Sequence, residues 1–219
     1  NGYNATLTGY TTATPSTSLN EGMTSNYVAG FTPINNALSF DGADDFVNIT
    51  SPFTGFTNAI TVETWINLNT LTSAEGVAGQ STANVNDLAT SNVWLLGNIG
   101  TSDGSLTFFV NDNGAFRSAT STTDFRGTGW HHVVGVADAS GVTLYVDGVV
   151  EATSSTGIGS NIFSNAGAIV HLGKDSRFAS GRFMDGQMDE VRIWNVARTC
   201  AEIRSTKDVE LTGSETGLV

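Results

Sequence analysis

Alternation of apolar and polar residues is the main periodic pattern in this chain, and it predicts strands rather than helices. The clearest case is the apolar alternation over residues 142–146, which is followed by Asp147-Gly148 and a second strand-like run, Val-Val-Glu, at 149–151. An Asp-Gly pair favours a type I′ turn, so the two runs predict a hairpin. Further strands are predicted at residues 37–40, 46–50, 60–68, 92–99, 106–110, 115–120, 130–137, 169–173 and 186–195.

One short helix is predicted near the end of the sequence. Thr199 and Glu202 have the Thr-x-x-Glu spacing of a capping box, which predicts a helix over residues 200–207. Many antiparallel strands with short turns and a single late helix indicate an all-β fold made of two packed antiparallel sheets. The length of 219 residues is compatible with one such domain.

The charge of the chain is acidic and unevenly distributed. The formal net charge is -12, and all nine basic residues lie at or after Arg117. Nucleic-acid binding is excluded as a function class, because it requires a basic face that replaces phosphate counterions. Insertion into a membrane is not expected either, because no apolar run approaches the roughly 18 residues that a spanning helix needs. Cys200 is the only cysteine, so no internal disulfide can form.

Five sequence blocks occur in a characteristic order. They are ALSFDGADDFV at 37–47, VETWI at 62–66, WHHVV at 130–134, LYVDG at 144–148 and MDEVRIW at 188–194. In this order they resemble the laminin-G-like (LamG) jelly-roll module of the concanavalin A-like lectin/glucanase superfamily, in the form repeated in secreted and surface proteins of Bacteroidetes. The resemblance implies a concanavalin A-like jelly roll with one short C-terminal helix, as a single domain over residues 1–219.

The two ends of the chain depart from a simple module. Residues 211–219 resemble the lead-in to a strand, and residues 1–7 resemble the strand that follows it in such modules. We therefore expect a chain cut inside a repeating array. Residues 1–33 are expected to form an edge strand and a long loop, 34–207 the core module, and 208–219 the start of a further strand or a linker.

A calcium site is predicted at the first acidic turn. Asp41, Asp44 and Asp45 lie close together without a basic residue nearby, and hard carboxylate oxygens suit Ca²⁺. The resemblance adds Asp189, which matches an aspartate that helps hold a structural calcium between early and late strands in jelly-roll glucanases. The predicted ligands of a structural Ca²⁺ are Asp41, Asp44 and Asp189. The alternative is a solvated turn that binds no metal.

The resemblance also raises the possibility of glycoside hydrolase activity, because the superfamily includes such enzymes. A retaining glycosidase needs two carboxyl groups about 5 to 5.5 Å apart, and jelly-roll glucanases supply them as Glu-x-Asp-x-Glu along one strand. This chain has no such run: Asp189 and Glu190 are adjacent, so they point to opposite faces, and Glu63 has no acidic residue two positions away. We therefore predict no catalytic residues and no enzyme activity.

A ligand-binding loop is predicted at residues 174–186, which combine three of the nine basic residues with two phenylalanines. Arginine forks bind hydroxyl or carboxylate groups, and aromatic faces can stack on sugars. Arg177, Phe178 and Arg182 are the predicted ligand-binding residues. In the alternative interpretation the phenylalanines pack inward and the arginines pair with local acids.

Together these observations predict a non-catalytic, extracellular carbohydrate-binding or adhesion module with structural calcium. Such a lectin-like domain would be secreted or displayed at the cell surface. Its partners would be a polysaccharide or glycan and the neighbouring domains of a multidomain chain. Two alternatives stay open at this point: a structural spacer or protein-binding repeat of a large cell-surface adhesin, and a divergent glycoside hydrolase.

Overall fold

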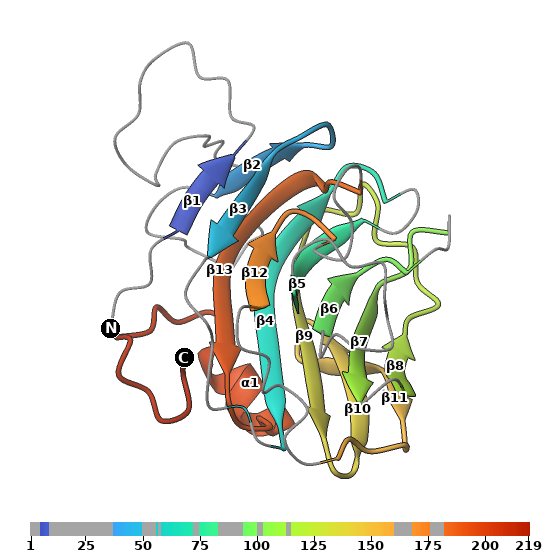
Figure 1. Cartoon of the computed structure of the whole chain (residues 1–219), viewed down its shortest axis with the longest axis vertical. Helices are drawn as coiled ribbons and strands as arrows, with labels where there is room; N and C mark the ends of the chain where they lie inside the picture. The colour runs from blue at the N-terminus through green and yellow to red at the C-terminus, as the bar shows by residue number, and fades with distance from the viewer. Residues whose placement is uncertain are drawn as a thin grey trace.

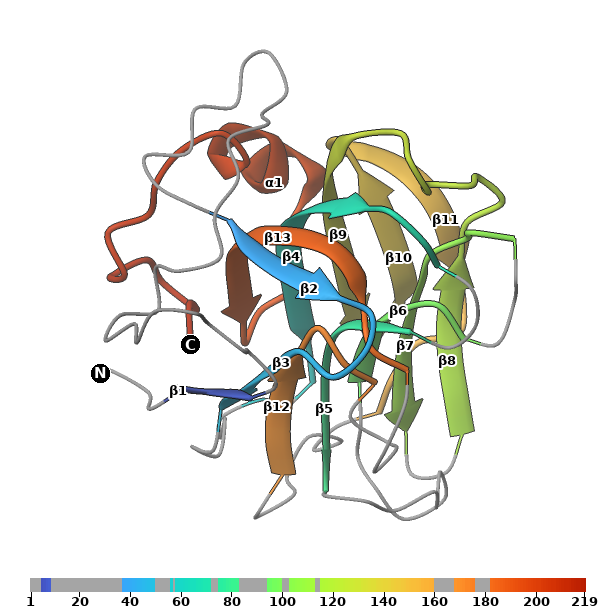
Figure 2. The same ribbon diagram turned by 90° about the horizontal axis from the view of Figure 1, so that it is seen from above.

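The computed structural model describes ten parts of the chain, namely residues 5–8, 37–49, 56, 58–71, 75–82, 94–99, 103–112, 115–159, 168–175 and 182–219. These parts form two facing sheets with one helix outside them (Figures 1 and 2). The seven-stranded sheet has the order β1 (Ala5–Thr8), β3 (Phe46–Ile49), β12 (Ala168–Leu172), β5 (Gly76–Thr82), β6 (Trp94–Gly97), β7 (Thr107–Asp112) and β8 (Ala115–Thr120). The six-stranded sheet has the order β11 (Val149–Ser154), β10 (Gly141–Val146), β9 (Trp130–Asp138), β4 (Ile60–Leu68), β13 (Asp185–Trp194) and β2 (Leu38–Asp41).

All pairs of named strands are antiparallel, which confirms the predicted two-sheet antiparallel sandwich. Strand β1 lies at the edge of the seven-stranded sheet beside β3, and the rest of the predicted edge segment at residues 1–33 lies outside the described residues. Within the described chain, no helix combines the length and the apolar character needed to cross a membrane.

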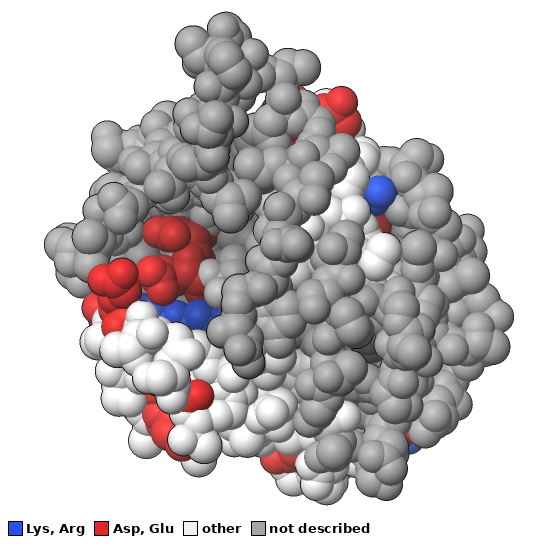
Figure 3. Space-filling view, turned by 60° about the vertical axis from the view of Figure 1, so that its left-hand side comes forward, with Lys and Arg blue, Asp and Glu red and all other residues white. Residues whose placement is uncertain are grey.

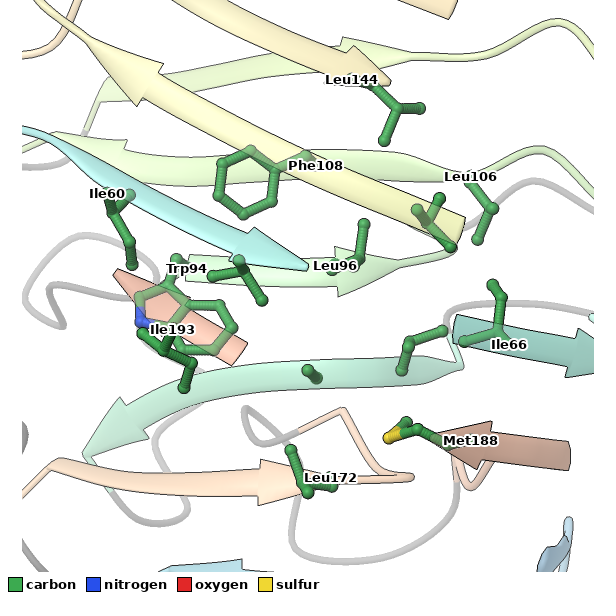
Figure 4. Packing of buried hydrophobic residues seen from close by; sticks show 14 of the residues in the cluster. Ile60, Ile66, Trp94, Leu96, Leu106, Phe108, Leu144, Leu172, Met188 and Ile193 are labelled. Atoms are coloured by element: carbon green, nitrogen blue, oxygen red, sulfur yellow. The ribbon is translucent and has the colours of Figure 1, made fainter. Parts of the chain in front are cut away.

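The core lies between the two sheets, where alternate residues of each strand point inward (Figure 4). Trp94 and Phe108 come from the seven-stranded sheet, and Ile66 and Leu144 come from the six-stranded sheet. The ring of Phe108 packs so closely on β9 that a Cβ atom built on Gly135 would lie 2.1 Å from the Cγ atom of Phe108. Only a residue without a side chain therefore fits opposite this ring.

The predicted helix is confirmed as α1 (Cys200–Thr206), and its capping box is complete. The Thr199 hydroxyl accepts a hydrogen bond from the Glu202 N–H (3.3 Å), and the Glu202 carboxylate accepts one from the Thr199 N–H (2.7 Å). Ile203 of α1 packs with Val134 and Val136 on the outer face of the six-stranded sheet. The helix therefore covers part of that face.

A buried ionic cluster lies beneath this helix, around the carboxylate of Glu63 on β4. Its Oε1 atom accepts hydrogen bonds from Trp194 Nε1 (2.8 Å) and Arg198 Nη1 (2.9 Å). Arg192 Nη1 lies 3.9 Å from the same atom, and His132 Nε2 lies 3.4 Å from Oε2. Glu63 is fully buried, so the Trp194 indole and the guanidinium groups of Arg198 and Arg192 replace part of the water that the carboxylate loses on folding.

Candidate functional site

Two regions that are far apart in sequence meet at one end of the sandwich, at the top of Figure 1. The turn between β2 and β3 contacts the chain leading into β13, because the Gly42 N–H donates to the Met184 carbonyl (3.0 Å). Asp41 at the end of β2 is paired with Asp185 at the start of β13. The acidic turn therefore lies beside the described end of the predicted basic loop, at residues 182–185.

The acidic turn brings three carboxylates together. One oxygen from each of Asp41, Asp44 and Asp45 lies within 4.8 Å of the others. The Asp41 N–H donates to Asp45 Oδ2 (3.2 Å), and the Ala43 N–H donates to Asp41 Oδ1 (2.8 Å). Burial and the negative charge of Asp41 raise the pKa of Asp45, with a further contribution from Asp44, against the lowering effect of the hydrogen bond from Asp41. A cation among these oxygens would offset that repulsion.

Asp185 is a fourth carboxylate at this end of the molecule. Its side chain packs against the turn, since a Cβ atom built on Gly42 would lie 3.0 Å from the Cβ of Asp185. Its Oδ1 accepts a hydrogen bond from Asn69 Nδ2 (2.9 Å), and its Oδ2 accepts one from Thr70 Oγ1 (3.2 Å). Asp185 was not predicted from the sequence, because only the pairing of β2 with β13 reveals that it faces Asp41.

Asp189, the third predicted calcium ligand, is not brought to this turn. It is paired with Trp65 of β4 and lies four residues beyond Asp185 along β13, roughly 13 Å away at the rise of a β-strand. Its Oδ1 accepts a hydrogen bond from the Glu190 N–H (2.8 Å). Burial raises the pKa of Asp189 to about 6. The group that meets in space is therefore Asp41, Asp44 and Asp45.

A basic and aromatic group adjoins the acidic turn on the side of β3. Lys174 Nζ lies 4.7 Å from the ring centroid of Phe46 and 5.3 Å from that of Phe183, distances typical of cation–π contacts. The two rings are 6.0 Å apart, and Lys174 is only 7% exposed. Burial lowers the pKa of Lys174, partly against the charge of Asp175, which raises it.

His171 and Asn48 add two buried polar atoms to this group. They face each other on β12 and β3, and the ring of His171 lies 5.7 Å from that of Phe46. Neither His171 Nδ1 nor Asn48 Oδ1 has a hydrogen-bond partner among the described residues, although His171 is only 8% exposed. Burial, followed by the charge of Lys174, lowers the pKa of His171 to about 4, so its ring is neutral at pH 7. Buried polar atoms normally have a partner, so these two atoms are candidates for contact with a ligand.

Arg182 is the predicted ligand-binding residue that the structure describes, whereas Arg177 and Phe178 lie outside the described residues. The Arg182 side chain is 35% exposed, with Nη1 3.6 Å from Asp175 Oδ2. Its carbonyl accepts hydrogen bonds from the N–H groups of Gly76 (3.4 Å) and Asp175 (3.1 Å), which fix its main chain beside Lys174. We refer to Phe46, Asn48, His171, Lys174, Arg182 and Phe183 as the loop-end cluster.

Comparison with protein families identifies the superfamily. The model of the concanavalin A-like lectin/glucanases superfamily (Laminin_G_3) matches residues 41–204. The chain therefore belongs to this superfamily, as its five sequence blocks predicted. No curated protein matches the sequence.

Solved structures show the same jelly-roll fold. Domain 4 of AbnA, a GH43 extracellular arabinanase from Geobacillus stearothermophilus, in complex with arabinotriose, has a TM-score of 0.64 at 19% identity, covering 92% of this chain and 86% of that one. The CBM40 domain of the Ruminococcus gnavus IT-sialidase bound to α2,3-sialyllactose has a TM-score of 0.57 at 14% identity, covering 68% and 82%. A SAP-like pentraxin from Limulus polyphemus has a TM-score of 0.52 at 19% identity, covering 78% and 87%. The predicted concanavalin A-like jelly roll is thus confirmed.

Proposed function

We propose that this protein is a non-catalytic carbohydrate-binding module that binds its ligand at the loop-end cluster. The observation that carries the proposal is the meeting of Arg182 and the two phenylalanine rings with polar atoms of His171 and Asn48 that have no hydrogen-bond partner within the described parts of the chain. Two structures with this fold, the arabinanase domain and the sialidase domain, were solved with oligosaccharides bound. The extracellular arabinanase also supports a secreted or cell-surface location for this chain.

Each member of the loop-end cluster has a distinct proposed role. The partly exposed Arg182 guanidinium donates hydrogen bonds to sugar hydroxyl or carboxylate oxygens. The rings of Phe46 and Phe183, both half-buried, provide an apolar surface against which a sugar ring packs. Neutral His171 and the Asn48 amide oxygen complete the hydrogen bonding of a hydroxyl group that displaces solvent from the site.

The environment of Glu63 supports a binding role rather than hydrolysis. A retaining hydrolase needs two carboxyl groups about 5 to 5.5 Å apart and open to substrate. Glu63 is instead enclosed beneath α1, where Arg198 and Trp194 hold its carboxylate. The charge of Glu63 therefore stabilises the packing of the helix on the sheet through Arg198.

A structural Ca²⁺ at the acidic turn is the second part of the proposal. Asp41, Asp44 and Asp45 would hold it through carboxylate oxygens, and the raised pKa of Asp45 is what such an ion would reverse. The ion would supply positive charge that fixes the turn next to the loop-end cluster. The contact of Gly42 with Met184 would transmit this rigidity to the loop.

Calcium is expected to raise the melting temperature of the protein by several degrees relative to the same sample in chelator. At a concentration about 100 times Kd, a ligand that binds only the native state adds about 2.7 kcal/mol of stability. Differential scanning calorimetry in CaCl₂ and in EDTA measures the shift. Substitution of the exposed Asp44 by asparagine should remove most of the calcium-dependent rise in melting temperature. Asp208→Asn, beside Lys207, should leave that rise unchanged. Equal melting temperatures in calcium and chelator would exclude the metal site.

The binding function is tested by a glycan and polysaccharide array probed with the whole chain in the presence of calcium. We expect retention on at least one glycan class without release of reducing sugar. An array that stays blank at micromolar protein, with the protein shown to be folded by circular dichroism, contradicts carbohydrate binding. Release of reducing sugar by the folded protein would instead assign a hydrolase.

A further inference from the structure

The charges around the loop-end cluster are mainly negative. Five carboxylates of described residues lie at this end of the sandwich, and they belong to Asp41, Asp44, Asp45, Asp175 and Asp185. They are accompanied by the cations Lys174 and Arg182. The ring of His171 adds no charge at pH 7, since burial, followed by the charge of Lys174, lowers its pKa to about 4. On the face that Figure 3 brings forward, acidic side chains likewise cover more of the described surface than basic ones.

Both cations are already engaged within the protein. Lys174 Nζ lies 4.7 Å from the ring centroid of Phe46 and 5.3 Å from that of Phe183, and the residue is only 7% exposed. Arg182 Nη1 lies 3.6 Å from Oδ2 of Asp175, which is fully buried. Because Asp175 partly neutralises it, the Arg182 guanidinium offers N–H donors without a full positive charge to attract an anion. A sugar hydroxyl needs only these donors, whereas a carboxylate also needs a counter-charge.

The remaining basic residues of the sequence do not reverse this balance. Arg126, in the chain before β9, is bound by Asp124 through contacts of 2.6 and 2.8 Å. The other described basic residues lie on β8 or around α1. Outside the described parts, the sequence holds one basic residue, Arg177, against two acidic ones, Glu21 and Asp87. Arg177 and a bound Ca²⁺ together would at most balance the five carboxylates, and they would leave no excess of positive charge.

This lack of excess positive charge sets the cost of binding an acidic sugar. A carboxylate or sulfate group loses hydration when it enters a binding site, and the loss is offset only where an opposite charge replaces the water. Asp185 lies three residues from Arg182, and hydrogen bonds from Asn69 Nδ2 and Thr70 Oγ1 fix its carboxylate in place. An acidic ligand would therefore meet repulsion as well as dehydration.

We propose that the loop-end cluster selects uncharged sugars and rejects sugars that carry a carboxylate or sulfate group. This inference rests on the carbohydrate-binding function proposed above and narrows the class of its ligand. Arg182 then donates its hydrogen bonds to hydroxyl oxygens. Asp185 and the acidic turn supply the repulsion that excludes acidic competitors.

An array of matched glycans tests this selection. Galactan, mannan and glucan are each printed beside a sample in which primary hydroxyl groups have been oxidised to carboxylates, and lactose is printed beside 3′-sialyllactose. We expect retention to be confined to the uncharged members of these pairs. Where both members are retained, the Kd of the acidic member should be higher by roughly fivefold, the effect of one or two unit charges about 5 to 8 Å away in water.

Two results on this array would count against the account in different ways. Equal or stronger retention of acidic members would overturn the selection of uncharged sugars but leave carbohydrate binding intact. An array that stays blank for every glycan would overturn carbohydrate binding itself, and the selection with it.

The substitution Asp185→Asn separates the effect of charge from the other effects of oxidation. It removes one negative charge but keeps an oxygen that accepts a hydrogen bond from Asn69 or Thr70. We expect the Kd of the acidic member, divided by that of the neutral member, to fall by about twofold. Asp138→Asn is the matched control, because Asp138 accepts hydrogen bonds from the N–H and hydroxyl of Ser140 at the far end of β9. It should leave this ratio unchanged.

Salt provides a second readout of the same repulsion. Raising NaCl from about 0.02 M to about 0.5 M should narrow the difference between the two members for the wild type, since salt screens charges near the surface. A ratio of Kd values that neither Asp185→Asn nor salt changes would overturn the proposal, because the discrimination would then not come from charge.

Discussion

Substitution of Glu63 by alanine is expected to lower the free energy of unfolding by about 3 to 5 kcal/mol, the usual cost of removing one partner from a buried ionic cluster. The side chains of Arg192, Arg198 and His132 would keep their buried positions without the carboxylate that they surround. Urea denaturation followed by circular dichroism measures the loss. Glu151→Gln, on the edge strand β11, is the matched control and should change stability by less than about 1 kcal/mol.

The same cluster predicts a specific pH dependence. Burial alone would raise the pKa of Glu63, but contact with His132 and the charges of His132, Arg198 and Arg192 lower it below its ordinary value of 4.5. A lowered pKa in the folded state adds stability above pH 4.5, and this stability is lost as the pH falls through the folded value. The stability difference between the wild type and Glu63→Gln should therefore narrow below about pH 4. A difference that stays constant from pH 3 to 7 would show that the charge of Glu63 contributes nothing.

Truncation of Phe108 to alanine is expected to cost about 3 to 5 kcal/mol, because it opens a cavity between the two sheets. Gly135→Ala alone should also destabilise, by about 1 to 3 kcal/mol, since its Cβ would overlap the Phe108 ring. Denaturant titrations of both single variants and of the double variant form a complete cycle.

The double variant Phe108→Ala/Gly135→Ala should lose less stability than the sum of the single losses. Without the ring, the alanine methyl group on β9 occupies space that the single substitution would leave empty. Additive losses would contradict the packing of Phe108 directly on Gly135 and would place the ring elsewhere in the core.

The sequence predicted the fold well where strands are half-buried. Alternation marks β10 clearly, because its residues 142, 144 and 146 are buried while those between them are partly exposed. Strand β5 (Gly76–Thr82) was missed, because both of its faces are covered and two glycines interrupt the pattern. The helix was found because its capping box is a local signal. Hydrophobic periodicity therefore predicts strands that are buried on one face, but it does not identify strands that are buried on both faces.

The candidate site was only partly predictable for a related reason. Asp41 and Asp44 could be found because neighbours in one turn are neighbours in space. Asp185 and His171 become part of the site through strand pairing, which a single sequence does not reveal. Asp189 was predicted through a family resemblance. It lies on β13 four residues beyond Asp185, the residue that is paired with Asp41.

The central claim is that the loop-end cluster binds carbohydrate, and a titration of Arg182→Gln tests it most directly. Arginine and glutamine are both unbranched at Cβ, so glutamine should tolerate the φ of 66° at position 182 as well as arginine does. Isothermal titration calorimetry would use the glycan that gives the strongest array signal, with Arg204→Gln on α1 as the control. Loss of charged hydrogen bonds worth about 1.5 to 3 kcal/mol predicts a Kd raised roughly 10- to 150-fold for Arg182→Gln and unchanged for Arg204→Gln. An unchanged Kd for Arg182→Gln would contradict the assignment of the binding site.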